Sequence, residues 1–94
     1  MSNPGKYVII YDISDDKERN RLAKLLEGFG FRVQESAFEC LLTRPGRERL
    51  LAEIAAQELE TGFVNIYRIN EKSKVITLGQ PPPPSPDADC LFLV

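Results

Sequence analysis

The first long apolar run of the chain, Tyr7 to Tyr11, predicts a β-strand over about residues 6–12. Its five residues are apolar or aromatic and mostly favour extended backbone, which is typical of a central strand covered on both faces. Asp12 closes the run and should lie where the strand leaves the core, where a rigid sheet can hold a carboxylate for chemistry. A second interpretation stays open, in which Asp12 only caps the turn into the next helix.

The segment after this strand has the three- and four-residue spacing of a helix that begins near Asp15 and ends at the glycines of positions 28 and 30. Asp15 and Glu18 have the spacing of a capping box, and their charge suits the positive end of the helix dipole. Arg19 and Arg21 stand about 200° apart around such a helix, so they should point in different directions. The apolar residues that recur along it predict its core-facing stripe: Leu22, Leu25, Leu26 and Phe29.

Five more elements follow from the pattern. The apolar alternation changes phase near residue 36, which predicts two strands over about 31–35 and 37–43 with a very short junction. Pro45 suits the first turn of a second helix over about 46–60, with Thr43 or Arg44 as its cap. Residues 62–70 alternate as a strand, and Lys74 to Leu78 predict a further short strand.

This order of elements, β-α-β-β-α-β with an extra strand, predicts a ferredoxin-like α+β sandwich over residues 1–79. Two helices would cover one face of the sheet, and a second copy of the chain is the simplest cover for the other, so we expect a homodimer. Residues 80–94 are a proline-rich linker that ends in an apolar segment, which we expect to dock on the sheet edge of a partner. The alternatives are that this segment folds back onto its own subunit or stays unfolded. Its residues are Cys90, Leu91, Phe92, Leu93 and Val94.

Composition narrows the chemistry of any site. The chain has 94 residues, no histidine and two cysteines, Cys40 and Cys90, so neither a zinc site nor a disulfide framework is expected. A bound metal would be a hard ion held by carboxylates, Mg²⁺ or Mn²⁺. No apolar run is long enough to span a bilayer, and the first residues lack a signal region, so we expect a cytoplasmic protein without a membrane partner.

The charge distribution leaves room for nucleic acid despite a net charge of −2. Residues 1–49 hold nine Lys and Arg against eight acids, whereas residues 50–94 hold three against six. Lys72 and Lys74 are expected to be solvated turn residues. A local basic face is predicted near the first helix and the segment after it, from Lys17, Arg19, Arg21, Lys24 and Arg32.

The sequence resembles the small CRISPR-associated adaptation proteins, the Cas-two family, which are partners of the Cas-one integrase. The resemblance covers about residues 6–79 and rests on a strand ending in YDISDD, an R-x-R pair on the next helix, the segment GFRVQESAFEC and a late strand ending in Leu-Gly. It implies a ferredoxin-like homodimer in which Asp12 is the metal-binding and catalytic acid. By position it also implies residues that support that acid or contact the substrate: Tyr11, Arg19, Arg21, Arg32 and Phe38.

Two functions fit this resemblance. As a scaffold for spacer acquisition, the dimer would bridge integrase dimers and hold double-stranded DNA by its phosphates without reading sequence. As a metal-dependent endonuclease, it would hydrolyse DNA or single-stranded RNA through Asp12 at the dimer axis, with Mg²⁺ or Mn²⁺ activating water. The apolar tail favours the scaffold, which is our prediction, and Asp12 followed by the arginine pair favours the nuclease. A small ligand-sensing module is a third interpretation, but it gives the arginine pair no role.

Overall fold

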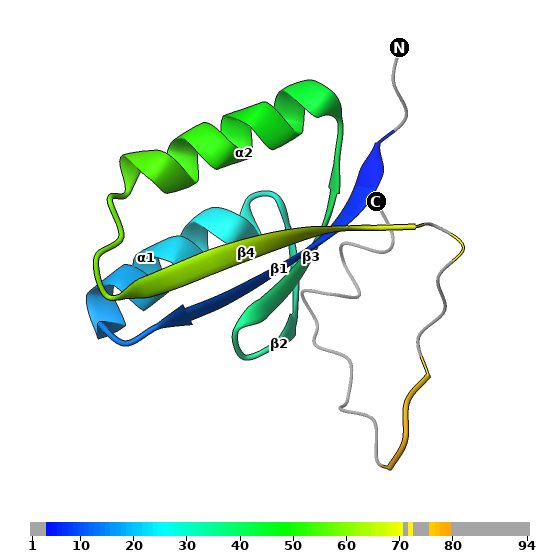
Figure 1. Cartoon of the computed structure of the whole chain (residues 1–94), viewed down its shortest axis with the longest axis horizontal. Coiled ribbons are helices and arrows are strands. Elements are labelled where there is room, and N and C mark those ends of the chain that lie inside the picture. The colour runs from blue at the N-terminus through cyan, green and yellow to red at the C-terminus, as the bar shows by residue number, and fades with distance from the viewer. Residues whose placement is uncertain (1–3, 71, 73–75, 80–94) are drawn as a thin grey trace.

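The computed structural model describes residues 4–70, 72 and 76–79, and within them it forms one antiparallel sheet and two helices. The strand order across the sheet is β2-β3-β1-β4, and both helices lie on the same side of it (Figure 1). This arrangement confirms the predicted ferredoxin-like α+β sandwich. In chain order the elements are β1 (Gly5–Ile13), α1 (Asp16–Glu27), β2 (Gly30–Gln34), β3 (Ala37–Leu42), α2 (Arg44–Ala56) and β4 (Gly62–Ile69).

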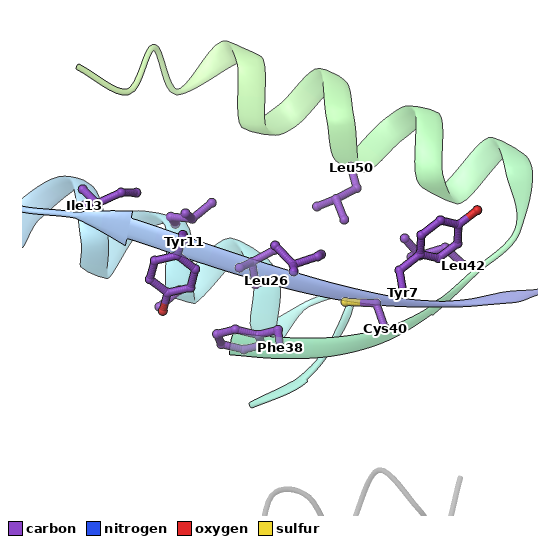
Figure 2. Packing of buried hydrophobic residues seen from close by; sticks show 11 residues of the cluster. Tyr7, Tyr11, Ile13, Leu26, Phe38, Cys40, Leu42 and Leu50 are labelled. Atoms are coloured by element: carbon purple, nitrogen blue, oxygen red, sulfur yellow. The ribbon is translucent and has the colours of Figure 1, made fainter. Parts of the chain in front are cut away.

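The hydrophobic core lies between the helices and one face of the sheet, as Figure 2 shows. The predicted stripe of α1 is confirmed, because two of its leucines are fully buried and Leu25 and Phe29 pack against the core from its edge. The buried residues come from every second position of β1 and from the facing sides of β3 and the helices: Tyr7, Ile9, Tyr11, Ile13, Leu22, Ala23, Leu26, Phe38, Cys40, Leu42 and Leu50.

The prediction that β1 is covered on both faces is wrong for the single chain. Ile10 is 41% exposed and Asp12 is exposed, because they point away from the side that carries both helices. Strand pairing places residues of β3 and β4 beside them on the same side. We call this side the open face and define it by its outward-pointing residues: Lys6, Val8, Ile10, Asp12, Glu39, Leu41, Phe63, Asn65, Tyr67 and Ile69.

The start of α1 confirms the predicted cap and corrects the capping box. Asp15 is the N-cap, and its Oδ2 accepts a hydrogen bond from the Glu18 amide at 2.9 Å. The Glu18 carboxylate, however, accepts from the Thr61 hydroxyl at 2.6 Å and from the Glu60 amide at 3.0 Å. These bonds, led by that of the Thr61 hydroxyl, lower the pKa of Glu18. They also tie the first turn of α1 to the start of β4.

The hairpin of β2 and β3 has the form that the change of phase predicted. Residues 35 and 36 make the turn, and the register shifts between Arg32 and Gln34. A bulge of this kind moves later side chains to the other face of the sheet, which explains the uneven alternation. Gly30 lets the two strands approach, because an added Cβ there would lie 2.1 Å from the Glu39 carbonyl oxygen.

The second helix, α2, begins as predicted and ends early. Thr43 is its N-cap and Pro45 lies in its first turn. The helix ends at Ala56 rather than at residue 60, because Glu58 has a φ of 50° and so adopts left-handed backbone that cannot continue a helix.

Two predictions concern the last part of the chain: a short strand over 74–78 and a docking segment at Cys90 to Val94. Residues 76–78 fall in the short strand expected over 74–78, but they are not in a strand, and Ile76 and Leu78 are 86% and 89% exposed. Residues 74 and 75 lie outside the described residues. So do residues 80–94, which include the whole predicted docking segment, Cys90 to Val94. In the part of the chain that is described, no helix has the length and apolar character needed to cross a bilayer.

Candidate functional site

Asp12 lies near the end of β1 on the open face, where its side chain is exposed. Within the described residues its carboxylate makes no hydrogen bond and no ion pair. Its pairing partner on β4 is Phe63, and the next residue, Gly62, brings the two strands close. A Cβ on Gly62 would lie 1.8 Å from the Asp12 carbonyl oxygen, so this glycine fixes where β4 holds the acid. The interpretation of Asp12 as a helix cap is wrong, since Asp15 fills that position.

A shallow depression of about 850 Å³ brings Asp12 together with two of the predicted cations, Arg19 and Arg32. It lies at the end of β1, between the start of α1 and the turn of the β2–β3 hairpin. The two guanidinium groups at its wall could bind a phosphate while the carboxylate binds a cation. Its lining is Ile10, Tyr11, Asp12, Ile13, Arg19, Asn20, Ala23, Arg32, Glu35, Ser36 and Phe63.

Arg19 and Arg21 diverge as the helical wheel predicted. Arg19 donates to the Ile13 carbonyl at 3.0 Å and pairs with Asp16, so it stays beside the end of β1. Arg21 instead donates to the Gln57 carbonyl at 2.9 Å, and the Gln57 amide donates back to the Arg21 carbonyl at 3.3 Å. Arg21 therefore joins α1 to the end of α2 and is not part of the depression around Asp12.

Tyr11 and Phe38 are core residues, and Tyr11 also lines the depression around Asp12. Both are buried, and their rings stack with centroids 6.3 Å apart and an angle of 29° between their planes (Figure 2). The Tyr11 hydroxyl donates to the Glu35 carbonyl at 3.3 Å, and burial raises its pKa. Arg32 lies over the Phe38 ring at 5.2 Å and is itself exposed, so it covers the core and faces solvent at once.

The residues present fit a metal ion only in part. Among the residues that the structure describes, no group of three or more acid, cysteine or histidine side chains is close enough to hold an ion. One chain therefore offers Asp12 as a single carboxylate. Mg²⁺ keeps several waters and can be held by one or two carboxylates with the phosphates of a substrate. A second Asp12 from another copy of the chain would supply the second of these carboxylates.

The open face is apolar along much of its area. Leu41 is 66% exposed, Phe63 52% and Tyr67 49%. With Ile10 they lie on three adjacent strands of this face, from Phe63 beside Asp12 to Leu41 beside Lys6, and they share the face with Glu39 and Asn65. A large exposed apolar surface of this kind marks an interaction site.

A second group of cations lies at the opposite end of β1, and the sequence pattern did not reveal it. Lys6, Arg68 and Lys72 line a depression of about 630 Å³ together with Pro4, Gly5, Ile69 and Asn70. Lys6 is far from the other two in sequence, and antiparallel pairing brings the start of β1 to the end of β4. The predicted ferredoxin-like topology could have found them, because in it the first strand pairs antiparallel with the last.

Comparison with known proteins identifies the family. The family model for the CRISPR-associated protein Cas2 matches residues 6–75. The chain belongs to the Cas2 family. It is 44% identical over 73 residues to a Mycobacterium tuberculosis protein named CRISPR-associated endoribonuclease Cas2, a match that covers 78% of this chain. The chain spans 65% of the length of that relative.

Solved structures agree with this placement. A hypothetical protein from Thermus thermophilus, TT1823, has 36% identity and a TM-score of 0.75, covering 87% of this chain and 99% of that one. A chain in a structure described as a partial Cas6-RT-Cas1-Cas2 complex has 34% identity and a TM-score of 0.60. That match covers 77% of this chain and 90% of the other. The predicted resemblance to the Cas-two family is thus confirmed.

Proposed function

We propose that this chain is a scaffold subunit for spacer acquisition. As a homodimer it bridges integrase dimers and holds a DNA duplex by its phosphates, without reading the base sequence. The observation that carries the proposal is the open face, an apolar surface that both helices leave uncovered beside an exposed acid. A second copy of the chain, packed open face against open face, is the cover that the chain itself can supply.

The partner in this proposal is the Cas1 integrase. Its support is the similarity to a Cas2 chain in a complex whose description includes Cas1. We assign the integrase contact to the apolar end of the chain, Cys90 to Val94, because a short apolar strand can extend the edge of another sheet. Catalysis at Asp12 has no use for such a segment.

The residues around Asp12 support a structural task better than a catalytic one. Tyr11 and Phe38 are in the core, and Arg21 joins the helices. Arg19 and Arg32 remain at the surface near Asp12, where both can contact phosphate. A duplex held by these cations needs no metal and no activated water.

A reconstituted integration assay tests the proposal with two variants. Truncation after Gly79 should abolish association with the integrase, measured by co-purification, and with it the insertion of a short duplex. Asp12→Ala should leave both intact. The proposal fails if Asp12→Ala stops insertion while the truncated chain still supports it.

A second function, metal-dependent endonuclease, is favoured by the depression that places Asp12 beside Arg19 and Arg32. Two copies of Asp12, facing each other across the dimer axis, would hold Mg²⁺ or Mn²⁺ with the substrate phosphate. A bound ion would supply an activated water and offset phosphate charge. Arg19 and Arg32 would orient the RNA or DNA chain.

The test of this second function is cleavage of labelled single-stranded RNA and duplex DNA with and without Mg²⁺. Asp12→Asn keeps the shape of the side chain and removes its charge, so it should abolish metal-dependent cleavage if Asp12 holds the ion. Cleavage that persists in Asp12→Asn would rule out this site.

A further inference from the structure

We propose that Lys6, Arg68 and Lys72 form a second contact site for the phosphate chain of duplex DNA, at the end of the sheet opposite Asp12. We call these three residues the distal cations. The inference rests on the proposed DNA-holding function and adds to it a site that lies outside the depression around Asp12.

The distal cations gather because of how the strands pair. Lys6 stands opposite Ile69, and Tyr7 stands opposite Arg68, so the start of β1 meets the end of β4. Lys72 follows in the turn after β4, where its amide donates to the Asn70 side chain at 2.9 Å. The depression of about 630 Å³ between them is open to solvent at the end of the sheet.

Arg68 has a defined place in this cluster. Gly5 lacks a side chain, and a Cβ added there would lie 3.4 Å from the guanidinium carbon of Arg68 and 3.3 Å from the Tyr7 ring. The glycine thus leaves room for Arg68 to lie across the start of β1 beside Tyr7. Arg47 reaches the Tyr7 hydroxyl from α2 at 3.5 Å, which adds another positive charge on that side.

The charge of the distal cations is poorly compensated within the described residues. Lys6 pairs with Glu39 at 2.7 Å, but neither Arg68 nor Lys72 has a carboxylate at ion-pair distance in that part of the chain. The chain as a whole is acidic, with a net charge of −2. A local excess of positive charge on an acidic protein attracts a polyanion to that place.

The distance between the distal cations and the pair Arg19 and Arg32 fits a duplex better than a small anion. Lys6 and Asp12 are six residues apart on one strand, which is about 20 Å at the rise of an extended chain. A duplex presents a phosphate on each strand about every 3.4 Å, so this distance corresponds to about six base pairs. A duplex that passes beside the dimer, rather than over the open face that the second copy covers, would therefore meet Arg19 and Arg32 at one end of the sheet and the distal cations at the other.

The test is a salt titration of duplex DNA binding, followed by fluorescence anisotropy of a labelled duplex with the full chain. The test variant is Arg68→Gln with Lys72→Gln. The control variant is Arg44→Gln with Arg49→Gln, which removes the same charge from the exposed surface of α2. Melting curves of both variants establish that each is folded.

The expected result is a change in the salt dependence as well as in affinity. Each lost phosphate contact should make the slope of log K against log salt less steep by about 0.9, or about 1.8 for each subunit of the test variant that contacts the duplex. The control should keep the slope of the unmodified chain. An unchanged slope in the test variant, or an equal change in the control, overturns the second site while the proposed function stands. If the unmodified chain binds no duplex, both the site and the proposed DNA-holding function fall.

Discussion

The helix-covered face and the open face of the same sheet carry similar apolar side chains under very different cover. Phe38 and Ile9 on the covered face are fully buried, whereas Phe63 on the open face is 52% exposed and Ile10 41% exposed. Successive side chains of a strand alternate between the two faces of the sheet, so a strand that is apolar at every position places apolar side chains on both faces. The chain covers one face with its own helices and leaves the other for a partner.

The largest expected effect is on the covered face. Phe38→Ala should lower the free energy of unfolding by about 3–5 kcal/mol, because it leaves a cavity between Tyr11 and the helices. Urea unfolding followed by circular dichroism measures this loss. The matched control is Phe63→Ala, which should change the stability of the dilute chain by about 0.5 kcal/mol or less, since its ring is half exposed. Equal losses in the two variants would mean that the faces do not differ.

The next effect is on the association of two copies. Ile10→Glu should weaken the dimer by about 2–3 kcal/mol, roughly 30- to 150-fold, since it removes apolar burial and adds a charge at the centre of the open face. Sedimentation velocity over a range of concentrations measures it, and Ile10→Val is the conservative control. A dimer of unchanged affinity in Ile10→Glu would place the interface on another surface.

A smaller effect concerns the link between α1 and β4, and it depends on pH. The Thr61 hydroxyl and the Glu60 amide lower the pKa of Glu18 in the folded chain below its usual value near 4.5. Its contribution to stability is therefore present above that pH and is lost as the pH falls through the folded pKa.

Melting temperatures between pH 3 and pH 6 check this link. Below about pH 4.5 the unmodified chain should lose melting temperature more steeply than Glu18→Gln, whose amide does not titrate. Thr61→Val removes the main hydrogen bond and should flatten the profile in the same way. Parallel profiles of all three proteins would show that Glu18 does not supply the acid sensitivity.

The smallest effect is that of Arg32, which lies at the rim of the covered face. Arg32→Gln should lower stability by about 0.5 kcal/mol, the size of an exposed cation–π contact with Phe38. It should lower duplex affinity by more than that, because the guanidinium also faces the depression around Asp12. A large loss of stability with unchanged affinity would make Arg32 purely a packing residue.

The sequence predicted most of the fold, because most of the fold is local. The stripe of α1, the caps at Asp15 and Thr43 and the change of phase between β2 and β3 all depend on residues within a few positions of one another. The early end of α2 was missed, since Glu58 fits the helical period and its left-handed backbone leaves no mark in that pattern.

The site was predicted less completely, because its residues have roles that only contacts reveal. Tyr11 and Phe38 match the family motif, yet they stack on each other inside the core. Arg21 shares a motif with Arg19, yet it bonds to Gln57 on the far helix. The distal cations are more than 60 positions apart in the sequence, at 6 and at 68 and 72, and the pairing of β1 with β4 is what makes them one cluster.

The distance between the two copies of Asp12 tests the central claim most directly. Spin labels on Asp12→Cys, in a chain that also carries Cys90→Ser, would report that distance by double electron–electron resonance. Cys40 should stay unlabelled at neutral pH, because burial raises the pKa of its thiol to about 11. Packing of open face against open face predicts one short, narrow distance, and a longer one when the label is moved to Lys24→Cys on α1. No dipolar coupling at Asp12, or a shorter distance at position 24, would contradict it.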